Sequence, residues 1–217
     1  MKKKKQKFNF KENQKIIIAF FSFILFMILT YTIFNDGINK IDHHIENIVI
    51  NMRNKKLTNF MITITNLSSA YSLIVISILL LAIIKNKKIP TLIIINLIFS
   101  FLTSQFAKII MQRERPIDIS LVEAIGFSYP SGHSLISMAY FGFIAYLLYK
   151  HRTNNKLTKV ILITTLFITI LIIGFSRIYL GVHYFSDVIG GFLLSCSYLM
   201  IFININKKYL NEVMQWK

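Results

Sequence analysis

The chain has 217 residues, of which 54% are hydrophobic, and its mean hydropathy is +0.57. These values exceed those of an ordinary soluble domain and indicate an integral membrane protein. The formal net charge is +16. The basic residues cluster at the ends of apolar segments and form no continuous basic face, which excludes nucleic acid as a partner.

Six apolar segments have, or approach, the roughly 20 residues that a membrane-spanning helix needs. They cover residues 16–34, 57–84, 89–110, 131–149, 159–178 and 183–205. The linkers between them are short and charged, and no repeat or change of composition marks a second domain. The sequence therefore predicts an all-α, polytopic membrane protein with six transmembrane helices and one domain over residues 1–217.

The first 15 residues are basic and precede an apolar run that is too long for a signal-peptide core and lacks a small-residue cleavage site. If the N-terminus is cytoplasmic, 17 of the 25 Lys and Arg residues fall on the inner side of the membrane. Because Lys and Arg concentrate in cytoplasmic loops, this count predicts that both termini are cytoplasmic. With that topology, the candidate functional residues described below all fall at the outer ends of their spans.

The first outer loop contains an amphipathic pattern. Apolar residues recur at spacings of three and four, at Ile38, Ile41, Ile45, Ile48 and Met52. We expect a short helix that lies in the membrane interface near the mouth of the site, with Asp42, His43, Glu46 and Arg53 on its polar side. His43 and His44 are conceivable metal ligands, but adjacent histidines point to different faces of a helix.

The stretch KIIMQRERP contains the first candidate site residues. Lys108 and Arg115 are seven residues apart, which is about two helical turns, so both lie on one face if the helix continues. An isolated lysine in an apolar helix often extends its amine to the interface. Paired with Arg115, Lys108 instead becomes part of a candidate anion clamp.

The stretch YPSGHS stands immediately before an apolar segment and marks the start of a helix. Free N–H groups at a helix start bind anions, and Gly132 lets an oxyanion approach the backbone closely. His133 would then lie beside a bound anion and could pass a proton to a leaving oxygen. The alternative is a turn with an interfacial histidine.

The stretch GFSRIYLGVHYFSDVIGG adds Arg177, His183 and Asp187 in sequence that is otherwise lipid-like. His183 and Asp187 are four residues apart and share one face if the segment is helical. The carboxylate can then orient the imidazole as a nucleophile or base. A purely structural Asp–His pair is the alternative.

The charges of these three clusters indicate the class of ligand. Three cations and two histidines face one acid, which favours a multiply charged anion such as phosphate, whose oxygens a phosphoryl-transfer site must neutralise. A metal site is not expected, because the acidic ligands that Mg²⁺ prefers are missing and the cations would repel Zn²⁺. No GxSxG elbow supports serine-hydrolase chemistry.

The three clusters together resemble the type 2 phosphatidic acid phosphatase superfamily of membrane lipid phosphatases. The family pattern is Lys, six residues, Arg-Pro; then Pro-Ser-Gly-His; then Ser-Arg, five residues, His, three residues, Asp. It is complete here, with no departure, and SYPSGHS and SRIYLGVHYFSDVIGG are similar to the small bacterial phosphatidylglycerophosphatase B type.

The resemblance implies a role for each matched residue. His183 would form a phosphohistidine intermediate, Asp187 would orient His183, and His133 would be the general acid and then the base. Phosphate oxygens would contact the remaining matched residues, which are Lys108, Arg115, Ser131, Gly132 and Arg177. No metal or other cofactor is implied.

The expected function is hydrolysis of a lipid phosphate at the outer face of a bacterial cytoplasmic membrane, with phosphatidylglycerol phosphate as the favoured substrate. Undecaprenyl diphosphate and phosphatidate are alternative substrates, and a lipid phosphotransferase would use the same residues. The substrate would enter sideways from the bilayer, and no obligate protein partner is implied. A non-enzymatic lipid transporter is the alternative from another functional class.

Overall fold

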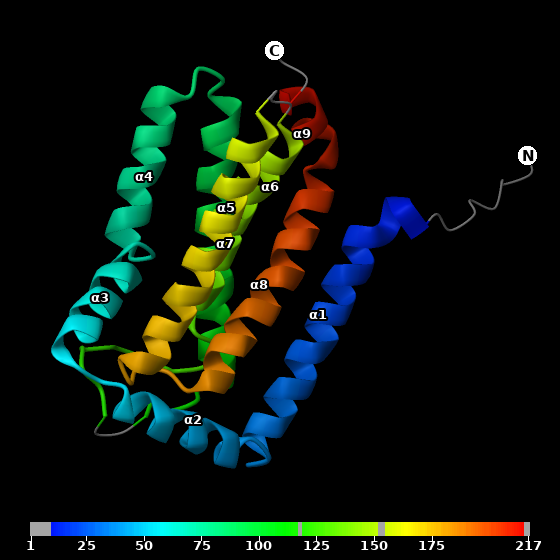
Figure 1. Cartoon of the computed structure of the whole chain (residues 1–217). Coiled ribbons are helices and arrows are strands. Elements are labelled where there is room, and N and C mark those ends of the chain that lie inside the picture. The colour runs from blue at the N-terminus through cyan, green and yellow to red at the C-terminus, as the bar shows by residue number, and fades with distance from the viewer. Residues whose placement is uncertain (1–9, 117–118, 152–154, 215–217) are drawn as a thin grey trace, which may run out of the picture.

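The computed structural model describes residues 10–116, 119–151 and 155–214. Over these residues the chain is helical and contains no strand, as predicted (Figure 1). The helices are α1 (Phe10–Phe34), α2 (Asn39–Asn51), α3 (Lys55–Asn66), α4 (Ala70–Ile83), α5 (Lys88–Met111), α6 (Gly132–Lys150), α7 (Lys156–Tyr179), α8 (Phe185–Ile205) and α9 (Lys207–Met214). Residues 1–9 of the predicted basic N-terminal segment lie outside the described residues.

Five of the described helices, α1, α5, α6, α7 and α8, are long and apolar enough to cross a membrane. The predicted span over residues 57–84 is not one helix, because α3 and α4 meet at an angle of 52°. The break falls at two serines whose hydroxyls bond the local backbone. Ser68 donates to the carbonyl of Thr65, and Ser69 accepts the N–H of Ser72 as the N-cap of α4. The described residues thus contain five candidate spans, or six if the bent pair is taken as one span.

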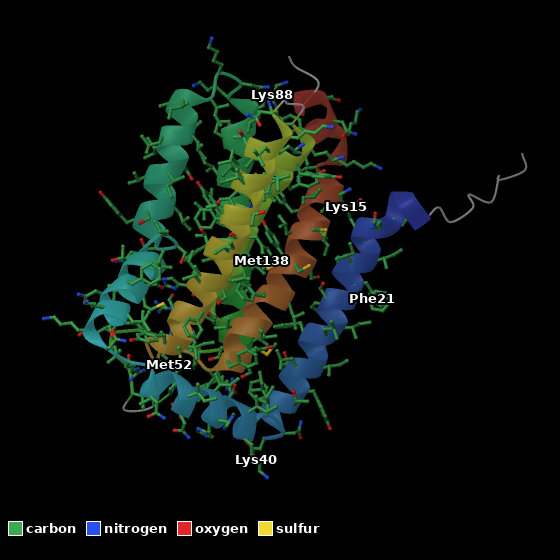
Figure 2. All side chains as sticks on the ribbon, in the orientation of Figure 1. Lys15, Phe21, Lys40, Met52, Lys88 and Met138 are labelled. Carbon is green, nitrogen blue, oxygen red and sulfur yellow. The ribbon has the colours of Figure 1, made fainter. Side chains whose placement is uncertain are left out.

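The outer surface of the bundle carries many large apolar side chains. Phe20, Tyr71, Ile83, Phe106 and Leu157 are all more than 60% exposed, and Figure 2 shows Phe21 on the outside of α1. An apolar surface of this extent is expected where helices face lipid. The interior packs around a separate cluster of buried side chains, which includes Tyr140, Phe143, Ile173 and Ile203.

The helix α2 runs across one end of the bundle, and α9 and the start of α1 lie toward the opposite end (Figure 1). Figure 2 accordingly shows Lys40 at the end that carries α2 and Lys88 at the other. The loops that follow α5 and α7 both return to the α2 end, so the three motif clusters converge there. The cytoplasmic position of the termini and the interfacial position of α2 stay predictions.

Two glycines let α8 approach the segment that begins α6. A Cβ on Gly190 would lie 2.4 Å from the ring of Tyr129, and one on Gly191 would lie 2.7 Å from the carbonyl oxygen of Ser131. Both distances are far below van der Waals contact. The close approach brings the second turn of α8 against the residues that precede His133.

Candidate active site

A cavity of about 690 Å³ opens where α4, α5, α6 and α7 meet the loops at the α2 end. Six of the eight predicted site residues line it: Lys108, Arg115, Gly132, His133, Arg177 and His183. The other two, Ser131 and Asp187, are fully buried behind its wall. The cavity therefore brings together residues from α5, α6, α7 and two loops, and both histidines face one space.

His183 lies in the loop that precedes α8 and is not part of the helix, contrary to the prediction that residues 183–205 form one segment. Its pairing with Asp187 is nevertheless present, with Nδ1 3.5 Å from Oδ2. The pairing arises because Asp187 lies in the first turn of α8 and turns back toward the loop, where it accepts the backbone N–H of Tyr184 at 2.8 Å.

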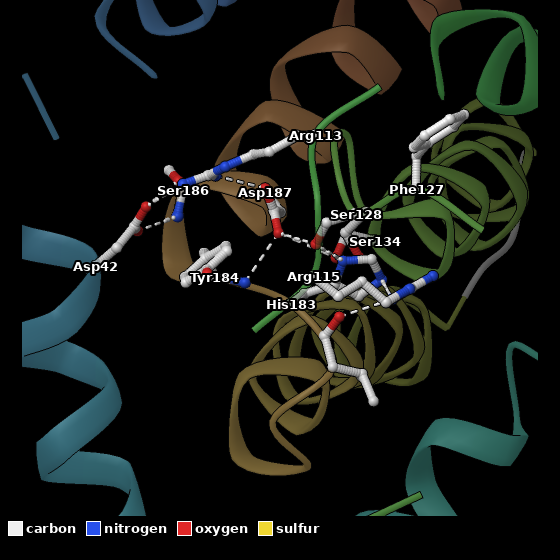
Figure 3. Close-up of polar contacts among 12 residues, drawn as sticks. Asp42, Arg113, Arg115, Phe127, Ser128, Ser134, His183, Tyr184, Ser186 and Asp187 are labelled. Carbon is white, nitrogen blue, oxygen red and sulfur yellow. Dashed lines mark hydrogen bonds and ion pairs between the residues drawn. The ribbon is translucent and has the colours of Figure 1, made fainter. Parts of the chain in front are cut away.

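Ser128 is the closest polar neighbour of the His183 Nδ1, with its Oγ at 3.2 Å. The same hydroxyl donates to Oδ2 of Asp187, so its lone pairs are available to accept a hydrogen bond from Nδ1–H. Both hydrogen bonds of the hydroxyl can form when Nδ1 of His183 carries the proton. The lone pair of the ring is then on Nε2. The His183 Nε2 lies 3.3 Å from Nη1 of Arg115, on the cavity side (Figure 3).

Asp187 is held from both sides. Its Oδ2 accepts from Ser128 and Tyr184, and its Oδ1 accepts from Nη1 of Arg113 at 2.6 Å. The carboxylate is completely buried, and a buried charge requires such compensation. Sequence reasoning assigned only His183 as its partner; the structure adds a cation and a hydroxyl.

Arg113 and Asp42 form a second ion pair behind Asp187, and sequence reasoning assigned neither to the site. Arg113 Nη2 donates to Oδ2 of Asp42 at 2.9 Å. Figure 3 shows the two carboxylates on either side of the Arg113 guanidinium. Asp42 was expected on the polar side of α2, yet its side chain is only 1% exposed. Arg113 stood out in the sequence only as a further basic residue between Lys108 and Arg115.

The three cations of the cavity differ in which of their N–H groups already have a hydrogen-bond acceptor in the protein. Lys108 bonds the carbonyl of Phe127, and Arg115 bonds the carbonyls of Ile125, Gly126 and Val182. Arg177 Nη1 donates to Oγ1 of Thr65 at 2.9 Å, while its buried Nε has no partner among the described residues.

Ser104 is a further cavity residue that sequence reasoning missed. It precedes Lys108 by one turn of α5, lines the cavity and is only 1% exposed. Its Oγ is also without a hydrogen-bond partner in the described part of the chain. The spacing of four from Lys108 was the one available signal, because it places both side chains on one face.

Burial sets the protonation of the groups in the loops. It lowers the pKa of His183 to about 3 in spite of the Asp187 carboxylate, so the imidazole is neutral near pH 7. Burial also lowers the pKa of Arg115. Although burial alone would lower the pKa of Arg113, Asp187 and Asp42 together raise it. The site thus combines a neutral imidazole with guanidinium groups that remain charged.

The acids near the cavity are more numerous than the sequence indicated. Glu123 also lines the cavity wall, and Asp42 and Asp187 lie behind it. None of the described residues forms a group of three His, Cys, Asp or Glu side chains that could hold a metal ion. His43 instead pairs with Glu46 at 3.0 Å on the exposed side of α2.

Comparison with known proteins gives one family. The model of the PAP2 superfamily matches residues 89–210. The chain is 34% identical to phosphatidylglycerophosphatase B of Bacillus subtilis over 176 residues, which are 79% of this chain and 86% of the relative. It is 30% identical to an undecaprenyl-diphosphatase of Sulfolobus acidocaldarius over 144 residues, which are 64% of this chain and 65% of the relative.

Two crystal structures share the fold. A transmembrane PAP2-type phosphatidylglycerolphosphate phosphatase from Bacillus subtilis superposes with a TM-score of 0.80 at 27% identity, over 92% of this chain and 98% of the other. LpxE of Aquifex aeolicus superposes with a TM-score of 0.57 at 24% identity, over 73% and 93% of the two chains. The second likeness concerns the fold alone.

Proposed function

The chain belongs to the PAP2 superfamily of lipid phosphatases, and on that premise we propose that it removes phosphate from phosphatidylglycerol phosphate at the outer face of the cytoplasmic membrane. The single observation that carries the proposal is the composition of the cavity. One part of its lining holds His133, His183 and Arg177, and another part is apolar. A lipid with a phosphorylated head group matches both parts.

His183 is the proposed nucleophile. Its neutral Nε2 would attack phosphorus and displace the lipid alkoxide, while Nδ1–H stays held by Ser128 and Asp187. His133, as an imidazolium paired with the bound phosphate, would give its proton to the alkoxide. The neutral His133 would then take a proton from the water that hydrolyses the phosphohistidine. Phosphate is thereby released and His183 returns to its neutral form.

The cations would neutralise the phosphate oxygens in both steps, which is the main task of a phosphoryl-transfer catalyst. Lys108, Arg115 and Arg177 all reach the cavity. Nε of Arg177 and Oγ of Ser104, which find no partner in the described part of the chain, support this assignment, because buried polar atoms in native proteins normally have one. Phosphate oxygens would fill both positions.

The apolar part of the cavity is the proposed path for the lipid tail. It is formed by Leu73 and Ile74 of α4 and by Leu97, Ile98, Phe101 and Leu102 of α5. Ile74, Ile98 and Leu102 are each more than half exposed, so this wall reaches the lipid-facing surface. A substrate could enter sideways between α4 and α5 while its head group stays beside the histidines.

The substrate assignment is tested with purified protein in phospholipid vesicles. Phosphate release is measured from phosphatidylglycerol phosphate, phosphatidate and undecaprenyl diphosphate, each with and without an added alcohol acceptor. The first substrate should give the highest kcat/KM, and a phosphorylated acceptor would indicate a transferase. His183→Ala should abolish turnover, whereas His151→Ala, at an exposed position on the opposite end of the bundle, should retain it. Full activity of the His183 variant would refute the nucleophile.

The membrane face is tested by labelling intact cells with a membrane-impermeant maleimide. Cys196 is the single cysteine, so Cys196→Ser gives an unlabelled background. Lys40→Cys on α2 should react from outside, and Lys88→Cys at the other end should react only after the cells are opened. The reverse pattern would place the site on the cytoplasmic side.

A further inference from the structure

Arg113 points away from the substrate cavity, although it lies between two residues that line it. It is absent from the cavity wall and borders a separate hollow that also includes Asp42 and Tyr184. Its guanidinium lies 4.3 Å above the ring of Tyr184 and bonds both Asp187 and Asp42. The cavity lining, with Asp187 buried behind it, therefore separates a bound phosphate from Arg113.

Asp42 binds the start of α8 from a different helix. Its Oδ1 accepts the backbone N–H of Ser186 at 2.9 Å, and its Oδ2 accepts the Ser186 hydroxyl. The N-cap residue of α8 is Tyr184, whose side chain makes no capping hydrogen bond. Asp42 thus satisfies a free N–H at the helix start, where a negative charge is also favoured by the helix dipole.

These contacts leave Asp187 little freedom to rotate. Arg113 holds Oδ1, and Asp42 holds both Arg113 and the backbone one residue before Asp187. The other oxygen, Oδ2, accepts from Ser128 and from the Tyr184 N–H, and it faces His183. Without Arg113, the buried carboxylate would lose its nearest guanidinium and would turn toward other donors.

We propose that Asp42 and Arg113 are positioning residues for the nucleophile, an inference that rests on the proposed function. They act through Asp187 on the orientation and tautomer of His183. The helix α2 lies outside residues 89–210, which match the family model, yet it would be part of the catalytic machinery. Neither residue touches the substrate cavity, so both should affect kcat and leave KM nearly unchanged.

Asp42→Asn is the sharpest variant, because it removes the charge and keeps an acceptor for the Ser186 N–H. We expect kcat to fall roughly 10- to 100-fold, which is the scale of a small displacement of a reacting group, with KM changed by less than about twofold. Arg113→Lys, which keeps the charge but not the two-armed contact, should also lower kcat. Glu46→Gln, one turn further along α2 and paired with His43, is the matched control and should behave as wild type.

A double-mutant cycle separates positioning from general loss of stability. If Asp42 acts through Asp187, Asp42→Asn should change the residual kcat of the Asp187→Asn variant by less than about twofold. An equal loss in both backgrounds, a rise in KM at constant kcat, or no loss at all would overturn the proposal. If Asp42→Asn does not fold, Arg113→Lys takes its place in the cycle.

A second readout does not depend on turnover. The chain has five histidines, and ¹⁵N-histidine NMR in detergent, with His183→Asn for assignment, reports the tautomer of His183. Wild type should carry the proton on Nδ1, and both Asp42→Asn and Arg113→Lys should reduce that population. If this shift occurs but wild type releases phosphate from no lipid, the proposed function fails and the positioning role stands. An unchanged tautomer in both variants would refute the positioning role.

Discussion

Ser128 Oγ lies 3.2 Å from the Nδ1 of His183, closer than the carboxylate of Asp187 at 3.5 Å. The hydroxyl connects the two residues, since it also donates to Asp187. The orienting group of the proposed nucleophile is therefore a Ser–Asp pair and not the carboxylate alone.

Removal of this hydroxyl should slow the reaction without weakening substrate binding. Ser128 is fully buried and does not line the cavity. Ser128→Ala should lower kcat roughly tenfold, which corresponds to the loss of about one charge-assisted hydrogen bond, and should leave KM unchanged. Steady-state kinetics on the preferred lipid measure both values. Ser137→Ala, which removes a buried hydroxyl in α6, serves as the control, and an equal effect there would argue against a specific role.

Ser104 should contribute to substrate binding. A phosphate oxygen that bonds its unpartnered hydroxyl gains about 1.5 kcal/mol or more, so Ser104→Ala should lower kcat/KM about tenfold or more. The inhibition constant of vanadate should rise in parallel. Ser100→Ala is the matched control one turn away, because the Ser100 hydroxyl already bonds the carbonyl of Leu97. A wild-type kcat/KM for Ser104→Ala would remove this residue from the phosphate site.

The depressed pKa of His183 predicts how stability depends on pH. In the unfolded chain a histidine titrates near 6.5, whereas the native pKa is about 3. Between these values the unfolded state binds a proton that the native state does not, so the free energy of unfolding falls as pH falls through this window. At pH 5 the contribution lost is on the order of 2 kcal/mol.

The measurement is the apparent Tm in detergent between pH 7.5 and pH 5. His183→Asn cannot titrate, so its Tm should decline less steeply with acid than that of wild type. His44→Asn, at an exposed position on α2, should show the wild-type slope. If the Tm of all three proteins declines equally with acid, the lowered pKa does not belong to the imidazole of His183.

The proposed tail path can be blocked from the lipid side. Ile98→Trp enlarges an exposed side chain of the apolar cavity wall. It should lower kcat/KM for a long-chain lipid phosphate several-fold and leave turnover of a short-chain, water-soluble analogue unchanged. Ile95→Trp, on the same helix but outside the wall, should affect neither substrate. Equal losses for the long and the short substrate would contradict lateral entry at this position.

The sequence alone was sufficient to predict the features that depend on residues close together in the chain. Hydropathy located the spans, because a helix in lipid needs a continuous apolar stretch. The recurrence of apolar residues between Ile38 and Met52 located α2, and YPSGHS located the start of α6. The motif residues could be picked out singly, because charged groups in apolar segments are conspicuous. The break between α3 and α4 was missed, since hydropathy does not respond to two serines that cap a helix.

The family and the principal residues of the candidate site were thus contained in local patterns of charge, spacing and hydropathy. Ser128, Arg113 and Asp42 were not, because an ordinary serine, arginine or aspartate acquires its role only from partners that are 55, 74 or 144 residues away. Only the packing of α2, α8 and the loop after α5 at one end of the bundle decided those contacts. The physical reason is that a buried carboxylate takes whichever donors the fold brings within reach, and chain order does not specify them.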